Sequence, residues 1–237
     1  MDPASKSEPA AGPPAPSGAP SWAVSAWQSY VGRKALMAAT GLVMFAYLLA
    51  HVAGNLQAFA GPVRLDHYAE QLRAFPALLW AIRAVLLVSL LVHVVAGGDL
   101  YLHRRQARPI DYADWRPAGS TPAARTMAIS GLLVLGFVVY HLLDLTFGVV
   151  NPDFRAGQVF HNVVVSFGRA AAVLLYLGAL VGLAFHLWHG LYAASQSLGA
   201  SSRALTPGIR RAAAALATIV TVGFAAVPLA VVFGVIG

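Results

Sequence analysis

The chain contains no cysteine in its 237 residues. This absence excludes disulfide bonds, and it excludes iron–sulfur clusters and thiolate zinc sites held by this chain, because all of them need cysteine sulfur. Charged residues are also scarce, at 11% of the chain, whereas soluble domains contain about 25%. Together with a hydrophobic fraction of 58%, this scarcity is typical of a polytopic membrane protein.

Other absences limit the function further. No glycine-rich phosphate-binding loop follows a strand pattern, and no polar segment between the apolar runs is long enough to form a soluble domain. The first 21 residues lack the apolar core of a signal peptide and are rich in proline, alanine and serine. We therefore expect residues 1–21 to be a disordered tail and residues 22–237 to form one transmembrane domain.

Five apolar runs follow this tail, and each is close to the ~20 residues that cross a bilayer. They cover Ala35–Gln57, Ala77–Leu102, Met127–Val150, Val163–Ser195 and Ala212–Ile236. Their length and the lack of alternation between apolar and polar residues exclude strands. The sequence therefore predicts an all-α fold of five transmembrane helices, of which the first four form an up-down bundle.

The basic residues predict the orientation. Of the 16 lysines and arginines, eleven flank the runs on the side of the N-terminus. By the positive-inside rule, the N-terminus is cytoplasmic and the C-terminus lies on the outer side. The net charge of +7 therefore reflects topology and anionic lipid head groups, and we expect no nucleic-acid partner.

Histidines occur inside four successive runs, as His51, His93, His141 and His186. At 1.5 Å of rise per residue, His93 and His186 lie roughly 13 Å from the cytoplasmic ends of their helices, and His51 and His141 lie roughly 21–24 Å from that side. The first and third helices of an up-down bundle are diagonal neighbours, as are the second and fourth. The histidines therefore form an inner pair, His93 with His186, and an outer pair, His51 with His141.

Two imidazoles that face each other across a bundle are typical of the axial ligands of a haem, and six-coordinate iron suits electron transfer. The pattern thus predicts two b-type haems. Glycines three or four residues from a ligand on its own helix would make room for them; these are Gly54, Gly97, Gly182 and Gly190. His189 competes with His186 as a ligand or contacts a haem propionate. The alternatives are histidines that only join helices by hydrogen bonds and a transporter that uses them for metal ions or protons.

Four segments carry a resemblance to a known family. They read GRKALMAATGLVMFAYLLAHVAGN, LLVHVVAGG, ARTMAISGLLVLGFVVYHLLDL and FHLWHGLYAASQSLG. In their order and spacing the chain resembles, from about Ser29 to its C-terminus, the cytochrome b subunit of succinate:quinone oxidoreductases, the five-helix diheme b558 type. The resemblance implies the same two ligand pairs.

The resemblance also implies partners and a location. The chain would anchor a flavoprotein subunit, which carries the dicarboxylate site, and an iron–sulfur subunit on the cytoplasmic face of a bacterial inner membrane. Electrons would pass through the two haems to a membrane quinone, with menaquinone expected. The alternative is the cytochrome b anchor of another quinone-linked complex, of the fumarate reductase, hydrogenase or formate dehydrogenase type. Some fumarate reductase members carry an acid two residues before the fourth ligand, and this chain has Ala184 there.

Secondary sites follow from polar residues near the ligands. For quinone protonation the first candidate is Glu70, in the amphipathic segment RLDHYAEQLRAF together with His67, Tyr68 and Arg73; the alternative is a surface helix whose charges are only solvated. The intramembrane carboxylate Asp144 is a second catalytic candidate, which could orient a haem ligand, relay a proton or reach the membrane surface. Arg83 and Arg169 could pair with outer haem propionates or with Asp144. Arg33, Arg125 and His189 are the candidates for contacts with the inner propionates.

Overall fold

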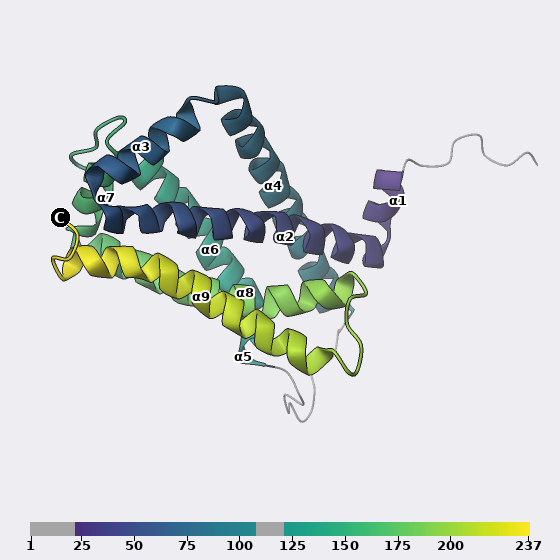
Figure 1. Ribbon diagram of the computed structural model, residues 1–237. Helices are drawn as coiled ribbons and strands as arrows, with labels where there is room; N and C mark the ends of the chain where they lie inside the picture. The colour runs from purple at the N-terminus through teal and green to yellow at the C-terminus, as the bar shows by residue number, and fades with distance from the viewer. Residues whose placement is uncertain (1–21, 108–120) are drawn as a thin grey trace, which may run out of the picture.

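The computed structural model describes residues 22–107 and 121–237, and all regular elements in these ranges are helices (Figure 1). Five of them are long and apolar enough to cross a membrane. They are α2 (Tyr30–Asn55), α4 (Pro76–Gln106), α6 (Met127–His141), α8 (Ala170–Ser197) and α9 (Thr206–Val232). The prediction of an all-α membrane protein with five membrane-spanning helices is confirmed.

Shorter helices connect the five long ones. They are α1 (Trp22–Gln28), the 3₁₀ helix η1 (Leu56–Ala60), α3 (Pro62–Arg73), α5 (Pro122–Arg125), the π-helical turn η2 (Leu142–Thr146) and α7 (Val159–Phe167). Proline occupies the first turn of α3, α4, α5 and α9. Its missing N–H costs no hydrogen bond there, because N–H groups of the first turn have no acceptor within the helix. The predicted disordered tail, residues 1–21, lies outside the described residues.

The expectation of one continuous fourth helix from Val163 to Ser195 was wrong. The run contains two helices, α7 and α8, which are separated at Gly168 and Arg169. Arg169 adopts an extended conformation (φ −99°, ψ 114°), and its guanidinium donates a hydrogen bond to the Val150 carbonyl oxygen at 2.7 Å. Hydropathy alone misses this break, because both helices are apolar and no proline separates them.

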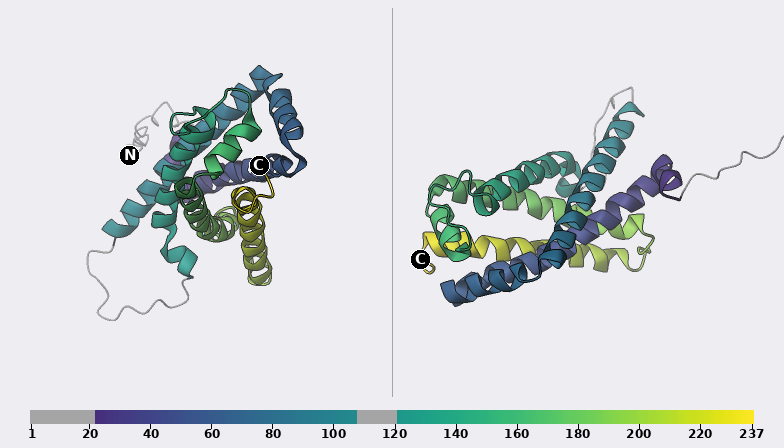
Figure 2. Two further views of the ribbon diagram at one scale, coloured as in Figure 1. Left: turned by 90° about the vertical axis from the view of Figure 1, so that its left-hand side faces the viewer. Right: turned by 90° about the horizontal axis from the view of Figure 1, so that it is seen from above.

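The four histidine-bearing helices pack in an up-down order. α4 packs along α2, α6 packs along α8, and α2 packs along α8. The first two pairs are antiparallel: Arg33 at the start of α2 bonds Asp99 near the end of α4, and His141 at the end of α6 lies beside Tyr176 near the start of α8. α9 covers the α2–α8 seam, where Phe45, Leu183 and Val220 share one buried cluster (Figures 1 and 2).

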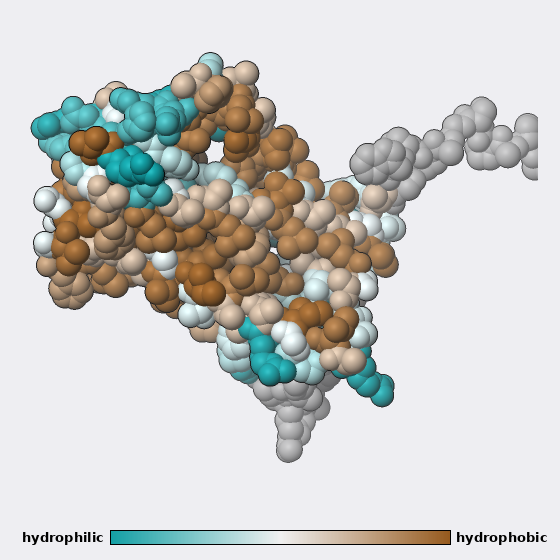
Figure 3. Space-filling model, in the orientation of Figure 1, coloured by the Kyte–Doolittle hydropathy of each residue, from teal (hydrophilic) through white to brown (hydrophobic). Residues whose placement is uncertain are grey.

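The bundle has two different ends. At one, which we call the basic end, α2 begins, α4 ends and α9 begins; at the other, the capped end, α3, η1 and α7 lie across the helix termini (Figure 1). Asp66 of α3 accepts a hydrogen bond from the Phe160 N–H of α7 at 2.9 Å, which ties the cap together. Hydrophobic residues cover the middle of the molecule between hydrophilic residues over α3 and near the beginning of α9 (Figure 3). This distribution is that of a membrane-spanning bundle.

One close helix contact allows a test of this packing. A Cβ atom at Gly223 of α9 would lie 2.6 Å from Val52 Cγ2 of α2, and a β-branched side chain in a helix has little freedom to move away. We expect Gly223→Ala to lower the stability of the bundle by about 1–3 kcal/mol, measured as a fall in the thermal unfolding midpoint in detergent micelles. The control is Gly136→Ala in α6, where a Cβ atom meets nothing within 4 Å. Equal stability of the two variants would contradict the described α2–α9 contact.

Candidate functional site: two pairs of opposed histidines

The first pair of histidines lies toward the capped end of the bundle. His51 of α2 and His141, the last residue of α6, face each other with ring centroids 5.7 Å apart and planes at 85°. Tyr47, one turn before His51, stacks on it at 5.2 Å, and Phe224 of α9 contacts its ring at 5.6 Å. Aromatic neighbours on its own helix and on α9 thus hold the His51 ring toward His141.

The second pair lies toward the basic end. His93 of α4 and His186 of α8 have ring centroids 6.1 Å apart and planes at 62°. His93 Nδ1 lies 2.9 Å from the Met37 carbonyl oxygen. A carbonyl oxygen only accepts hydrogen bonds, so Nδ1 carries the proton and Nε2 is left with the free lone pair. The backbone of α2 therefore fixes the tautomer that can bind a metal through Nε2.

The separation within each pair fits a haem. A metal–imidazole bond is about 2 Å long, so two rings on opposite sides of one iron have centroids about 6 Å apart. The observed centroid separations, 5.7 and 6.1 Å, agree with this value. His186 Nδ1 is buried and has no hydrogen-bond partner among the described residues.

Room beside the rings comes from glycines that the sequence did not single out. A Cβ atom at Gly41 of α2 would lie 3.1 Å from His93 Cε1, and one at Gly131 of α6 would lie 3.4 Å from His186 Cε1. Each of these glycines belongs to the helix that packs beside the ligand helix. The glycines on the ligand helices themselves have other neighbours: Gly54 faces Tyr68, Gly97 faces Met37, and Gly182 faces Leu133. Their role in making room for a haem stays a prediction.

A bare metal ion would need a different arrangement. The described part of the chain contains no group of three or more histidine, cysteine, aspartate or glutamate side chains that could hold one. Two opposed imidazoles are enough for iron whose four other ligands come from a porphyrin. Of the metal groups considered, the residues present fit a haem.

Asp144 is the centre of a buried hydrogen-bond network beside the outer pair. It lies in η2 and is 0% exposed. Its carboxylate accepts hydrogen bonds from Ser166 Oγ, from Tyr176 OH at 3.1 Å and from the Arg169 guanidinium at 2.6 Å. Tyr176 OH also lies 3.2 Å from His141 Nδ1. Of the two partners expected for Arg169, the structure shows Asp144.

Arg33 forms a corresponding contact at the basic end. It is paired with Asp99, whose backbone carbonyl oxygen also lies 2.9 Å from His103 Nδ1. Arg33 Nε is buried and has no hydrogen-bond partner among the described residues, so one donor is left for another group. Arg125 ends α5 and is exposed, and His189 is half-buried one turn beyond His186. Their propionate contacts stay predictions.

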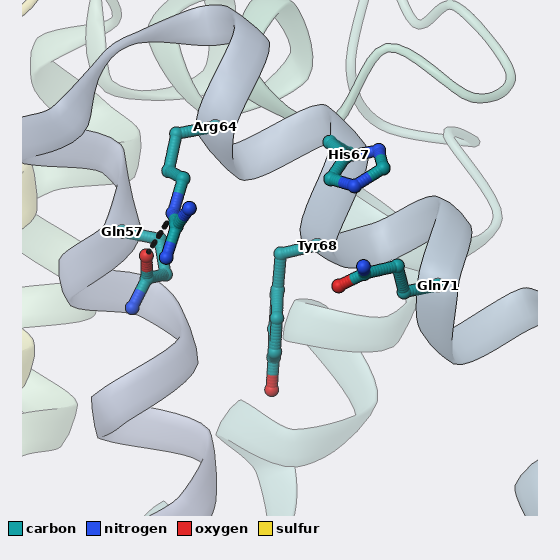
Figure 4. A pocket seen from close by; sticks show the side chains of 5 residues that line it. All are labelled: Gln57, Arg64, His67, Tyr68 and Gln71. Atoms are coloured by element: carbon teal, nitrogen blue, oxygen red, sulfur yellow. Dashed lines mark hydrogen bonds between the residues drawn. The ribbon is translucent and has the colours of Figure 1, made fainter.

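A polar pocket lies at the capped end, between η1 and α3 (Figure 4). Its volume is about 240 Å³, and Gln57, Arg64, His67, Tyr68 and Gln71 line it. The Tyr68 side chain points into the space below α3 in Figure 4, where its hydroxyl comes close to Gly54. Four of the lining residues belong to the segment RLDHYAEQLRAF, and two of them, His67 and Tyr68, are among the residues that the sequence indicated for quinone chemistry.

Glu70, the sequence-based candidate for quinone protonation, does not line this pocket. Its side chain is 69% exposed, and its carboxylate lies 3.9 Å from His67 Nδ1. The amphipathic pattern of α3 locates the segment but does not show which of its residues line the pocket. Arg83 lies over the Trp80 ring, 5.0 Å from its centroid. Arg73 donates a hydrogen bond to the Gly157 carbonyl oxygen in the loop between η2 and α7.

Comparisons with known proteins add no relative, because a scan of family models and searches of curated proteins and of solved structures found no match to this chain.

The Asp144 network yields a stability prediction. Asp144→Ala removes the buried carboxylate, so the Arg169 guanidinium loses its counter-ion and the Ser166 and Tyr176 hydroxyls lose their acceptor; we expect a loss of about 3–5 kcal/mol. The measurement is the unfolding midpoint in detergent micelles. Asp153→Ala is the matched control, since Asp153 also pairs with an arginine, Arg155, but is 53% exposed; its effect should stay within about 1 kcal/mol. Equal effects would show that Asp144 is not the buried centre described above.

Proposed function

We propose that this chain is the cytochrome b membrane anchor of a succinate:quinone oxidoreductase and carries electrons from an iron–sulfur subunit to a membrane quinone. The observation that carries the proposal is the pair of opposed histidine couples, with ring centroids 5.7 and 6.1 Å apart, inside a membrane-spanning bundle. The resemblance of the four histidine-bearing segments to that family gives the proposal its substrate.

The residues of the chain have separable tasks in this proposal. His93 and His186 would hold a haem toward the basic end, and His51 and His141 would hold one toward the capped end. A haem held by two histidines would supply one-electron transfer chemistry. Met37 fixes the tautomer of His93, while Gly41 and Gly131 keep space beside the inner rings.

The two ends of the bundle suit two different partners. The basic end would face the cytoplasm by the positive-inside rule, and there the flavoprotein and iron–sulfur subunits would dock. The capped end would take the quinone, in the pocket below α3. Quinone reduction consumes two protons, and His67 and Tyr68 in the pocket wall have the hydrogen-bonding groups to contact the quinone oxygens. Such a complex would lie in a bacterial inner membrane and work in the respiratory chain.

The first test is the haem content of the purified complex. A pyridine haemochrome assay and a dithionite-reduced-minus-oxidised spectrum should give two b haems per chain. His141→Ala should reduce this to one, because it removes a ligand of the outer pair only. His161→Ala is the control, since His161 contacts Asp153 in the outer loop and should leave two haems. Folded protein without haem would exclude the electron-transfer function.

The pocket gives a second test, of quinone binding. We expect His67→Ala and Tyr68→Phe to raise the KM for a water-soluble menaquinone analogue several-fold, because each removes a polar group from the pocket wall. Haem content should stay the same, since neither residue is a ligand. His103→Ala, at the basic end beside Asp99, is the control of the same residue type. An unchanged KM in both pocket variants, with a raised KM in Glu70→Gln, would place the quinone on the exposed face of α3 instead.

A further inference from the structure

We propose that Tyr176 and Asp144 are positioning residues for His141, which fix its ring nitrogen protonation and lower the reduction potential of the outer haem relative to a ligand without this support. The inference rests on the proposed function, since it concerns the haem that His141 would bind. It begins from a hydrogen-bond chain that runs from the His141 ring through Tyr176 to Asp144.

The direction of every bond in this chain follows from counting protons. The Asp144 carboxylate is paired with Arg169, and an ionised carboxylate only accepts hydrogen bonds. Tyr176 has one hydroxyl proton, which it therefore donates to Asp144 Oδ2 at 3.1 Å. Its oxygen can then only accept from His141, so Nδ1 of His141, 3.2 Å away, carries the proton. Nε2 is left with the lone pair that an iron would need.

The surroundings of the network keep these donor and acceptor roles fixed. Asp144 is 0% exposed and Tyr176 only 6% exposed, so no bulk water offers an alternative partner. Arg169 donates to the other carboxylate oxygen, Oδ1, and Ser166 donates to Oδ2 together with Tyr176. The π-helical turn η2 follows His141 directly and brings Asp144 inward; turns of this kind occur frequently at functional sites.

The other three ligand candidates lack such support. His93 donates to a neutral backbone carbonyl, and His186 Nδ1 has no partner among the described residues. The His51 ring has aromatic neighbours, Tyr47 and Phe224. Only at His141, within the described chain, does a hydrogen-bond chain lead from a ligand candidate to a carboxylate. The two haems would therefore differ in their axial ligands' surroundings even though both are bound by two histidines.

The hydrogen bond from His141 to Tyr176 would affect how strongly the His141 ring donates electrons to the haem iron. A histidine whose second nitrogen donates to a polarised acceptor is a more basic ligand and favours the ferric state. Second-shell hydrogen bonds are among the features by which proteins adjust haem potentials. Tyr176 would thus lower the potential of the outer haem, and the inner haem would be unaffected.

The experiment is a redox titration of the purified complex, followed by the haem absorption bands, in wild type and in Tyr176→Phe. We expect the outer haem to become up to about tenfold easier to reduce, a rise of about 59 mV for one electron, with the inner haem unchanged. The low-spin ferric EPR signal of the outer haem should also shift, because the loss of the Tyr176 hydroxyl frees the His141 ring to turn. The matched control is Tyr140→Phe: Tyr140 contacts the Tyr176 ring at a centroid distance of 6.0 Å but takes no part in the chain.

Each outcome has a distinct meaning. The inference is supported if Tyr176→Phe keeps two haems and raises the outer potential, while Tyr140→Phe keeps two haems and leaves that potential unchanged. Two haems with unchanged potential and EPR signal overturn it and leave the proposed function intact. Wild-type protein without haem overturns the proposed function itself. If Tyr176→Phe does not fold, Asp144→Asn takes its place: it keeps the size of the side chain but weakens the acceptor, and the outer potential should again rise.

Discussion

A polar group inside a bilayer has no water to bond with, and most of this structure is arranged around that constraint. Five long helices satisfy their own backbones, and the few polar side chains within them meet one another. Asp144 is the clearest case. It is fully buried near the end of a membrane-spanning segment. Its carboxylate accepts hydrogen bonds from Ser166 of α7, Tyr176 of α8 and Arg169, which lies between these helices. That set of contacts breaks the fourth apolar run and joins α6 to α8 at the capped end.

At the basic end, a single ion pair joins two helices. Arg33 and Asp99 join the start of α2 to the end of α4, so the ion pairs at the two ends connect different helix pairs. Between them, α2 packs on α8 and α9 covers the seam. The histidines therefore lie on helices whose relative positions are determined by contacts elsewhere, and this pre-arrangement brings each pair of rings to about 6 Å. Ligand geometry of this kind depends on rigid supporting elements.

The two histidine pairs are alike in spacing but not in surroundings. The inner pair has glycines beside it and a backbone carbonyl as a partner; the outer pair has an aromatic shell and a path of hydrogen bonds to a buried carboxylate. The pocket below α3 and the basic end lie at opposite ends of the bundle (Figure 1).

The sequence by itself determined the helical class, the number of spans and the level of each histidine, because hydropathy and a rise of 1.5 Å per residue are local properties. Up-down connectivity then left His51 opposite His141 and His93 opposite His186. Tertiary structure alone decided the rest. Nothing in an apolar run marks Tyr176 or Ser166 as partners of Asp144, and no pattern shows that Gly41 serves a histidine of another helix. Nor does amphipathicity tell that His67 and Tyr68 line the pocket while Glu70 faces outward. These features depend on which side chains from different helices meet, and such meetings are set by rotation and packing, which periodicity does not encode.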